Sequence, residues 1–259
     1  MTDRLNNNLA KIFACLSNSK RRQIIFTIND TSNEIFTDPL QNSLIIKELK
    51  NMEDLGLVKQ EQIGIYSLTT VGSAVAECSK GFEFLEKNKD FFADHGFGDV
   101  PKSLLKNIGR LINSQFFYGL HLVFPKWSKI VSESQEFVNC IFSQPPILIA
   151  DYIGPKIQRG LKIQVLFDKS SKIPDCNEFV NKLGLREHKT NENFNKRIAE
   201  SAKINLIMSE KEACVIFPDN TGIVDPHGNF ISSDPDFISW CREFFEYKWN
   251  DSEPIARLR

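Results

Sequence analysis

The chain has 259 residues, of which 41% are hydrophobic and 25% charged, and its formal net charge is −1. That composition is typical of a folded protein with room for two ordinary domains, and it excludes wholesale disorder and a strongly basic chain. No run approaches the ~18 consecutive apolar residues of a membrane-spanning helix, and the first residues lack the apolar segment of a signal peptide, so we expect a cytoplasmic protein without membrane contact.

Six cysteines are scattered through the chain, and no two of them form a CxxC pair. Disulfides are unexpected in the cytoplasm, and zinc ligands are spaced more closely than these cysteines are. A free cysteine usually behaves as a small hydrophobic residue. We therefore interpret the cysteines as buried thiols, and the sequence predicts neither a metal site nor a cofactor.

Two helices are predicted at the amino terminus. Apolar residues recur at helical spacing from Leu9 to Leu16, and either Ser17 or Ser19 is placed to cap a second helix. A basic cluster falls in the first turn of this second helix: Lys20, Arg21 and Arg22. Cations are unfavourable at a helix amino terminus. The cluster therefore either meets an anionic partner or forms a solvated charge run.

A third helix is predicted over residues 43–55, after a turn-rich segment at residues 30–42. Its two sides differ when the sequence is projected at 100° per residue. The apolar side comprises Leu44, Ile45, Leu49, Met52 and Leu55, and the polar side comprises Ser43, Lys47, Lys50 and Asp54. Gly56 follows as a left-handed terminating residue. Two strand-like pieces joined at Ile63-Gly64 then predict a β-ribbon, and a further helix runs from about Thr70 to Leu85.

This order of elements is the layout of a winged helix-turn-helix, in which one helix enters the major groove and the hairpin touches the flanking backbone. The stretch "LSNSKRRQIIFTI" resembles the opening of archaeal and bacterial ArsR-like winged-helix regulators, and "KELKNMEDLGLV…YSLTTVG" resembles their recognition-helix and wing signature. The resemblance implies a DNA-binding domain, which we place at residues 1–88. The helix that usually precedes the recognition helix is replaced by "NEIFTDPLQN".

The predicted DNA contacts lie on three segments: the recognition helix reads the duplex, the ribbon contacts the backbone, and the basic cluster holds a phosphate. These residues are Lys20, Arg21, Arg22, Ser43, Ile46, Lys47, Lys50, Lys59, Gln62 and Tyr66. Residues 1–80 nevertheless contain nine basic and nine acidic residues, whereas a DNA-binding domain is often basic. The alternative is a winged helix that serves protein contacts or dimerisation, in an interaction adaptor that no longer binds DNA.

Helices and strands alternate in the rest of the chain, which predicts an α/β or α+β domain over residues 89–259. We expect a turn at Gly96 and Gly98, then a helix with a stripe of Leu104, Ile108 and Leu111. A strand at residues 116–124 precedes helices at residues 126–142 and 147–160. The remaining predicted elements are a strand at 161–168, a helix at 176–183, a strand at 185–188, and a hairpin of 204–210 with 212–219.

The last predicted helix is capped by Asp234 and begins at Pro235. Its aromatic residues spread around much of its circumference, so it is either deeply packed or shared with a partner chain. The predicted fold class is therefore α+β: an amino-terminal winged helix-turn-helix followed by an α/β sensor-like domain.

Residues 89–259 also resemble a known family. The stretches that carry the resemblance are "DVPKSLLKNIGRL", "GLKIQVLF", "EACVIFPDNTGIVDPHGNFISSD" and "FISWCREFFEYKW". They are similar to the carboxy-terminal domain of archaeal methanogenesis-regulatory proteins of the filament-length-regulator type, which implies a transcriptional regulator whose second domain senses a signal. The step "RGLKIQVLF" also resembles the sensor domain of archaeal sugar-responsive regulators, which is related in fold to phospholipase D.

Enzymatic activity is not expected. Phospholipase D chemistry needs a histidine with a lysine two residues later, and the residues at that spacing from His95, His121, His188 and His227 are Phe97, Val123, Thr190 and Asn229. The chain also lacks GxSxG, P-loop and HExxH motifs. We interpret "HGFG" at residues 95–98 as a turn and His121 as a buried histidine in a strand. A phosphodiester hydrolase would require a histidine and a lysine that meet only in the fold.

Two residues are candidates for ligand binding in the second domain. Asp225, in "DPHGN", either fixes its turn through backbone hydrogen bonds or binds a ligand hydroxyl or amine. Arg159 either interacts with the carboxy-terminal end of a helix dipole or binds a ligand. The leading hypothesis is a homodimeric archaeal transcription regulator that binds double-stranded DNA and responds to an unidentified small-molecule effector.

Overall fold

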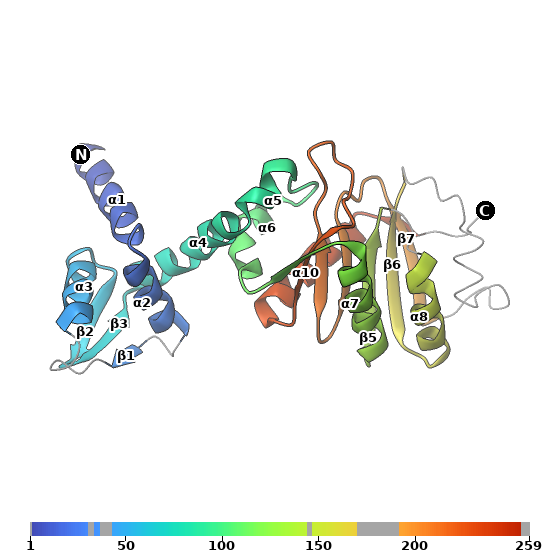
Figure 1. The fold of residues 1–259 in the computed structure, drawn as a ribbon, viewed down its shortest axis with the longest axis horizontal. Helices are drawn as coiled ribbons and strands as arrows, with labels where there is room; N and C mark the ends of the chain where they lie inside the picture. Colours follow the sequence, from blue (N-terminus) through green and yellow to red (C-terminus); the bar gives the residue numbers. More distant parts are fainter. Residues whose placement is uncertain (1, 31–33, 37–42, 144–146, 170–191, 255–259) are drawn as a thin grey trace. The chain divides into compact units, whose positions relative to one another are not determined.

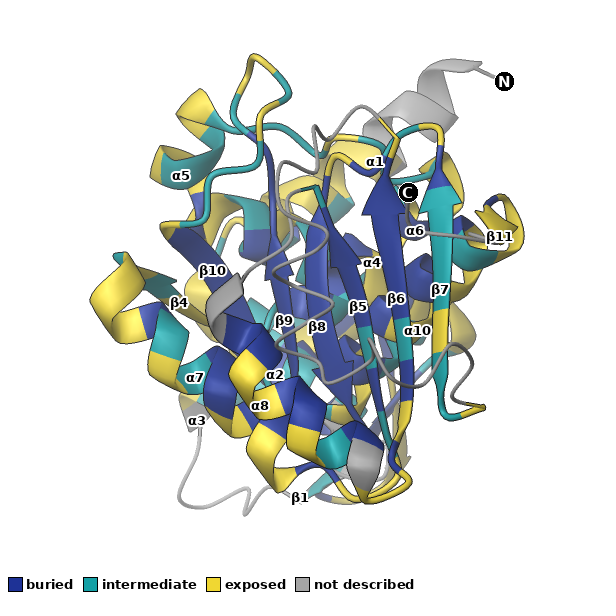
Figure 2. Ribbon diagram, turned by 90° about the vertical axis from the view of Figure 1, so that its right-hand side faces the viewer, coloured by how far each residue is buried: buried dark blue, intermediate teal, exposed yellow. Residues whose placement is uncertain are grey.

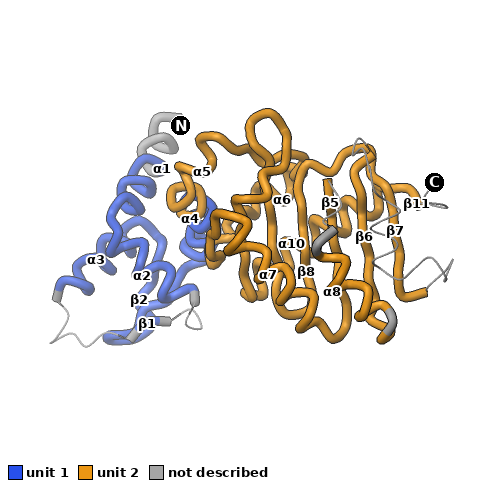
Figure 3. The backbone as a smooth tube through the Cα atoms, turned by 45° about the vertical axis from the view of Figure 1, so that its right-hand side comes forward, with its two compact units in different colours: residues 1–82 blue, residues 83–259 orange. Residues whose placement is uncertain are grey.

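The computed structural model describes residues 2–30, 34–36, 43–143, 147–169 and 192–254 (Figure 1). The chain forms two compact units, residues 1–82 and residues 83–259, called here the amino-terminal and carboxy-terminal units (Figure 3). The first unit ends at residue 82, whereas the sequence predicted a domain boundary at residue 88. The helix α4 (Thr70–Lys87) spans this boundary, since it begins in the first unit and ends in the second. The fold class is α+β, as predicted.

The amino-terminal unit contains the predicted succession of helices and ribbon. Its described elements are α1 (Thr2–Leu16), α2 (Ser19–Asp30), β1 (Glu34–Phe36), α3 (Ser43–Asp54), β2 (Val58–Gln62), β3 (Ile65–Leu68) and the first part of α4. The strand β1 was not predicted, and it lies in the segment expected to be irregular. It pairs antiparallel with β3, which gives a three-stranded sheet of order β1-β3-β2. Pro39 and the turn around it lie outside the described residues.

The cap of α2 differs from both serines suggested by the sequence. Asn18 Oδ1 accepts hydrogen bonds from the backbone N–H groups of Lys20 (2.9 Å) and Arg21 (3.2 Å). Asparagine suits this position because its side-chain oxygen reaches N–H groups that have no partner within the helix. Ser17 Oγ instead donates to the carbonyl of Ala14 in α1 (2.7 Å).

The helix α3 ends as predicted. Gly56 adopts a left-handed conformation with φ 72°. Its N–H donates to the carbonyl of Glu53 (2.8 Å), and the N–H of Leu57 donates to the carbonyl of Met52 (2.9 Å). These two bonds form a Schellman motif, which satisfies carbonyl groups at the end of the helix.

One side of α3 forms part of the core of the amino-terminal unit. Leu49 and Met52 are fully buried there, with Ile25 and Ile28 of α2 in the same cluster. The prediction for Leu44 was wrong, because this side chain is 70% exposed. Leu44 lies at the margin of the apolar stripe, where a 100° step carries it away from the core.

The wing is the hairpin of β2 and β3. Its turn contains Gly64 at φ 78°, a conformation that glycine adopts without steric cost. Ile63 precedes it and is 89% exposed. The predicted Ile63-Gly64 turn is confirmed, and the amino-terminal unit has the layout of a winged helix.

The carboxy-terminal unit is built around an eight-stranded sheet. Its described elements after α4 are α5 (Lys89–Asp94), α6 (Lys102–Lys106), the 3-10 helix η1 (Ile108–Leu111), β4 (Gln115–Tyr118), α7 (Leu120–Glu133), β5 (Phe137–Phe142), α8 (Ile147–Gln158), β6 (Lys162–Asp168), β7 (Phe194–Ala199), β8 (Asn205–Ser209), β9 (Ala213–Ile216), β10 (Gly228–Ser232), α10 (Pro235–Asn250) and β11 (Glu253–Pro254). The strand order is β11-β7-β6-β5-β8-β9-β10-β4. Strands β5, β6 and β7 are mutually parallel, and the other pairs are antiparallel.

The two faces of this sheet support two apolar cores. On β5, Cys140 and Phe142 belong to the cluster formed with α7 and α8, whereas Ile141 belongs to the cluster formed with α10. Successive residues of a strand point to opposite faces, so a strand covered on both sides is apolar throughout. The central strands are accordingly buried along most of their length (Figure 2).

Three predicted boundaries in this unit were wrong. The strand expected at 116–124 ends at Tyr118, and α7 begins after Gly119, which adopts φ 107°. His121 therefore lies on an exposed helical turn, not in a buried strand. The helix expected at 126–142 ends at Glu133, and its second half is the strand β5. Short apolar runs fit a strand or a buried helix equally well by periodicity.

Several other predictions are confirmed or extended. The β8–β9 hairpin and the strand β6 lie where expected, as does the turn at Gly98. The elements α5, β7, β10 and β11 were not predicted. The helix at 176–183 and the strand at 185–188, with His188 and Cys176, lie outside the described residues.

The last helix follows its predicted cap. Asp234 Oδ1 accepts hydrogen bonds from the N–H groups of Asp236 (2.9 Å) and Phe237 (3.3 Å). The aromatic side chains of α10 are mostly buried within the unit, including Trp240 and Phe244. Of the two interpretations offered by the sequence, deep packing in its own unit accounts for this helix.

The described cysteines are free thiols. Cys15, Cys140, Cys214 and Cys241 are buried, and burial raises the pKa of each thiol. Cys78 is exposed, contrary to the prediction. No described helix combines the length and the apolar character needed to cross a bilayer.

Candidate nucleic-acid interface

The outer side of α3 carries the two lysines on which the DNA-binding hypothesis depends. Lys47 and Lys50 are exposed, on the side of the helix opposite Leu49 and Met52, which are fully buried. Among the described residues, neither lysine takes part in an ion pair. The predicted separation of a basic outer side from an apolar inner side is thus present in the fold.

The basic cluster of α2 is less free than the sequence suggested. Arg21 Nε donates to Glu48 Oε2 of α3 at 2.5 Å. This hydrogen bond raises the pKa of Arg21, and the same bond lowers the pKa of Glu48. Arg22 donates to the carbonyl of Leu16 (2.6 Å), so both guanidinium groups already have partners in the protein. Lys20 is exposed and is the member of the cluster best placed for an anion.

The wing presents both polar and apolar groups. Lys59 Nζ lies 2.6 Å from Glu61 Oε1, and hydrogen bonds from Lys59 and Ser67 lower the pKa of Glu61. Gln62 is exposed, as is Ile63 at the tip. Tyr66 is only 3% exposed and belongs to the core. Its predicted role in DNA contact was wrong, because the alternation along β3 turns its ring inward.

The remaining predicted contacts lie at the start of α3. Ile46 is half-buried, which limits the surface it offers. Ser43 is the first residue of the helix, and its side chain lies outside the described set. Leu44 is a surface residue that sequence reasoning missed, one turn before Lys47 on the same helix surface.

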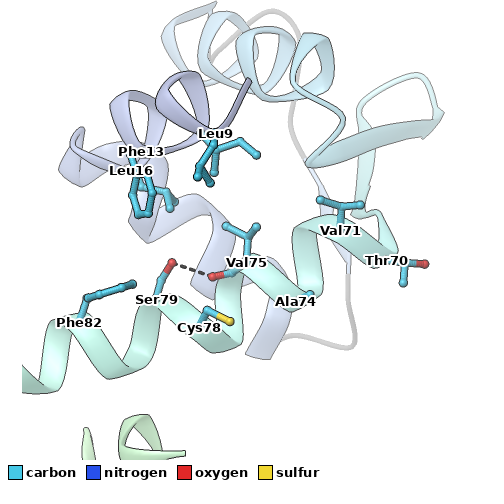
Figure 4. Close-up of a pocket in the computed structure, with 11 residues that line it drawn as sticks. Leu9, Phe13, Leu16, Thr70, Val71, Ala74, Val75, Cys78, Ser79 and Phe82 are labelled. Atoms are coloured by element: carbon cyan, nitrogen blue, oxygen red, sulfur yellow. Dashed lines mark hydrogen bonds between the residues drawn. The ribbon is translucent and has the colours of Figure 1, made fainter. Parts of the chain in front are cut away.

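An apolar groove lies between α1 and α4 within the amino-terminal unit (Figure 4). It has a volume of about 430 Å³, and no charged side chain lines it. Four side chains on its walls are each more than half exposed: Leu9, Phe13, Val71 and Phe82. The rings of Phe13 and Phe82 pack edge to face, with 6.4 Å between their centroids. Contiguous exposed apolar surface marks interaction sites and ligand-binding grooves.

In the carboxy-terminal unit, Asp225 holds two histidines. Its Oδ1 accepts hydrogen bonds from the backbone N–H (3.0 Å) and Nδ1 (2.9 Å) of His227, and its Oδ2 lies 3.2 Å from His95 Nε2. His95 Nδ1 in turn lies 2.9 Å from the carbonyl of Phe91. Both nitrogens of His95 therefore face acceptors, and both contacts are hydrogen bonds only when the ring carries two protons.

This cluster acts on the ionisation of Asp225 in two opposing ways. Burial raises the pKa of the carboxyl group, whereas the hydrogen bonds from the backbone and side chain of His227 and from His95 lower it, and the net effect is a lowered pKa. The hydrogen bond that Asp225 Oδ1 accepts from the backbone N–H of His227 agrees with the turn-fixing interpretation of Asp225. Arg159, the other ligand-binding candidate, is exposed just after α8 and is not part of the cluster.

No group of three or more metal-binding side chains with suitable geometry occurs in the part of the chain that the structure describes.

Residues 180–251 match the family model described as methanogenesis regulatory protein FilR1, middle domain. No curated protein matches the chain. The match covers the strands β7 to β10 and all of α10, so it concerns the carboxy-terminal unit alone. It supports regulation of transcription as the general class of function.

Three solved structures are similar to parts of the chain. TrmBL2, described as an archaeal chromatin protein with a novel mode of DNA binding, has 14% sequence identity and a TM-score of 0.44, over 91% of this chain and 93% of that chain. NucT from Helicobacter pylori has 12% identity and a TM-score of 0.43, over 55% and 99%. The phospholipase D family member Nuc from Salmonella typhimurium has 10% identity and a TM-score of 0.40, over 55% and 97%.

Proposed function

We propose that this protein is a DNA-binding transcriptional regulator. The observation that carries the proposal is the outer side of α3, where Lys47 and Lys50 are exposed beside a hairpin with the form of a wing. A helix of this kind fits the major groove, and the wing then lies against the adjacent backbone. The match of residues 180–251 to a regulator family supports the same assignment.

In this proposal the phosphate contacts come from few cations. Arg21 is paired with Glu48, and Lys59 with Glu61, which leaves Lys20, Lys47 and Lys50 as the main contributors. Each phosphate neutralised releases condensed counterions, and this release is the main source of affinity that does not depend on sequence. A single unit would therefore bind weakly, so we propose that two copies act together.

The apolar groove between α1 and α4 supports a homodimer. The groove and the exposed side chains beside it, Leu9, Phe13 and Phe82, lie on the same surface. A two-fold interface needs such self-complementary surface, because the same patch serves both partners. We propose that the occupant of the groove is the corresponding surface of a second copy, and that this dimer sets the spacing of the DNA half-sites.

A protein-interaction adaptor is the second candidate. Leu44 and Ile63 are 70% and 89% exposed on α3 and at the wing tip. Exposed apolar residues at these positions suit a protein partner better than a phosphate backbone. The nine basic and nine acidic residues of the first 80 residues agree with this alternative.

Binding to duplex DNA at increasing salt separates the two candidates. We expect the wild-type chain to bind duplexes that tile its own promoter region, with affinity that falls steeply with salt. Lys47→Ala with Lys50→Ala should reduce the magnitude of the slope of log K against log salt by about 3–4 units in a dimer, because four phosphate contacts are lost and each contributes ~0.9. An affinity independent of salt would favour the adaptor.

The matched control is Lys102→Ala with Lys106→Ala. Both lysines are exposed on α6 of the carboxy-terminal unit, and the double variant loses the same charge. We expect its salt slope to equal that of the wild type. If both double variants lower the slope equally, the effect comes from net charge and the assignment of α3 fails.

We also propose that the carboxy-terminal unit has no hydrolase activity. The support is that no histidine is followed by lysine at the spacing that phospholipase D chemistry requires, and that the imidazoles of His95 and His227 are both held by Asp225. Incubation with a generic phosphodiester tests this. Turnover that is lost in His95→Gln or His227→Gln would contradict the proposal.

A further inference from the structure

A polar hollow in the carboxy-terminal unit has no role in the function proposed so far. It lies between the strands β5, β6 and β7 and the second half of α10, and its volume is about 390 Å³. These three strands lie side by side in the sheet (Figure 1). The volume falls in the range of ~300–1,000 Å³ that is typical of small-molecule sites.

Three side-chain amides form one row across the hollow. Strand register places Asn139 of β5 opposite Gln164 of β6, and Gln164 opposite Asn195 of β7. Two residues further along the strands, Ile141 and Leu166 are fully buried in the core with α10. The amide row therefore lies where the apolar core ends, on the same face of the sheet.

The row contains an unsatisfied polar atom. Asn139 Oδ1 is buried and has no hydrogen-bond partner among the described residues. A buried amide oxygen without a partner is costly, and native proteins seldom leave one. An amide carries two donors and an acceptor that accepts two hydrogen bonds, so the row can bind donors and acceptors of a ligand together.

Both signs of charge line the rim. Arg242 and Glu246 are one turn apart on α10, and Lys162 and Glu192 stand on the sheet side. None of these four side chains forms an ion pair within the described residues, although Arg242 and Glu246 are neighbours on the helix surface. The guanidinium of Arg242 lies over the ring of Phe137, with 5.9 Å between its carbon and the ring centroid.

We propose that this hollow binds a small α-amino acid with a polar side chain. The guanidinium fork of Arg242 suits the carboxylate, since its planar donors form paired hydrogen bonds. Glu246, one turn away, suits the ammonium group. The amide row then receives the polar side chain and supplies Asn139 with the donor that it lacks. The lining charges, two positive and two negative, sum to zero, which favours a zwitterion over a dianion or a diamine.

This inference deepens the signal-sensing part of the proposed function and depends on that function for its regulatory meaning. Binding itself is independent of DNA. A chain that binds an amino acid but no duplex would contradict the proposed function and leave the hollow assigned. A chain that binds duplex DNA but no amino acid would contradict the assignment of the hollow and leave the proposed function intact.

Isothermal titration of the full chain tests the inference, with the standard amino acids added one at a time. A dicarboxylate, a diamine and a neutral sugar serve as comparison ligands. We expect at least one polar amino acid to bind and the comparison ligands to bind far more weakly. Arg242→Gln should weaken binding roughly 10-fold to 100-fold, the loss expected for charge-assisted hydrogen bonds.

Two further variants make the test specific. Asn139→Leu removes the buried acceptor, and we expect it to abolish binding while the far-UV circular dichroism stays native. Lys106→Gln is the matched control, because Lys106 is an exposed cation of the same unit that does not line the hollow. Equal losses in Lys106→Gln and Arg242→Gln would overturn the assignment. Binding of the sugar in place of amino acids would overturn the ligand class, and binding of neither would mean that the hollow holds water only.

Discussion

The two units differ in how far apart in the sequence their interacting polar residues lie. In the amino-terminal unit, Lys59 and Glu61 pair within one short strand, and Arg21 meets Glu48 across two helices that are close in sequence. In the carboxy-terminal unit, His95 meets Asp225 across 130 residues and Lys248 meets Asp99 across 149. Local patterns therefore describe the surface of the first unit well, and they say little about the polar contacts of the second.

The same contrast appears in the two candidate sites. The proposed DNA surface comes from one helix, the hairpin after it and Lys20 of the helix before it, so its residues could be predicted from local spacing and resemblance. The proposed amino-acid site draws on three strands and a helix, and one of those strands was predicted as helix. The predictions below test whether each unit depends on the contacts that the fold gives it.

The largest expected effect concerns Tyr66, which was predicted to contact DNA and instead lies in the core of the amino-terminal unit. Tyr66→Ala should lower the free energy of unfolding of that unit by about 3–5 kcal/mol, because it removes a buried ring. Tyr66→Phe keeps the ring, and we expect it to leave DNA affinity unchanged. Urea unfolding and a DNA titration check both variants. If a stably folded Tyr66→Phe protein loses DNA affinity, the hydroxyl group of Tyr66 contacts DNA after all.

The ion pair of Lys248 with Asp99 is the matching test in the carboxy-terminal unit. Lys248 Nζ lies 2.7 Å from Asp99 Oδ2, and both groups are largely buried. Lys248→Ala should destabilise the unit by about 3 kcal/mol, since it leaves a carboxylate without its partner in a poorly solvated site. Lys102→Ala removes an exposed lysine of α6 and is the control, so it should change the urea midpoint little. If Lys248→Ala and Lys102→Ala lower the urea midpoint by similarly small amounts, the ion pair of Lys248 with Asp99 is exposed to solvent in solution.

Asp225 tests whether the long-range cluster stabilises the same unit. Because the folded pKa of Asp225 is lowered, its stabilising contribution is complete above the unfolded pKa of about 3.9 and is lost as the pH falls through the folded value. Asp225→Asn should therefore be less stable than the wild type by about 1 kcal/mol at neutral pH.

That difference should shrink as the pH drops below about 4. Unfolding at a series of pH values measures it, with His95 and His227 as the titratable groups that face the carboxylate. Glu136→Gln removes an exposed carboxylate and serves as the control. A difference that grows in acid would contradict the assigned sign.

The smallest expected effect concerns Glu48, which neutralises Arg21 next to the proposed DNA surface. Glu48→Gln frees the guanidinium, so the magnitude of the salt slope of DNA binding should rise by about one unit per protomer. Asp54→Asn, on the same helix, removes the same charge without releasing a cation. If both variants change the slope equally, the pair with Arg21 has no influence on binding.

The errors of sequence reasoning have identifiable causes. Residues 137–142 were predicted as helix. The error arose because the spacing of apolar residues in so short a run fits a helix and a strand equally well. Tyr66 was predicted at the surface because a wing residue near a turn is often exposed, whereas the alternation of side chains along β3 places its ring in the core of the unit. The amide row could not be found, since its three residues are adjacent only through strand register.

The sequence by itself determined the helix periods, the glycine turns and the order of elements that gives a winged helix, because these depend on neighbours within a few residues. The tertiary structure decided which cations are neutralised, which aromatic side chains are core, and which amides share a hollow. Those outcomes depend on sheet register and on pairings across more than a hundred residues, and local propensity carries no information about either.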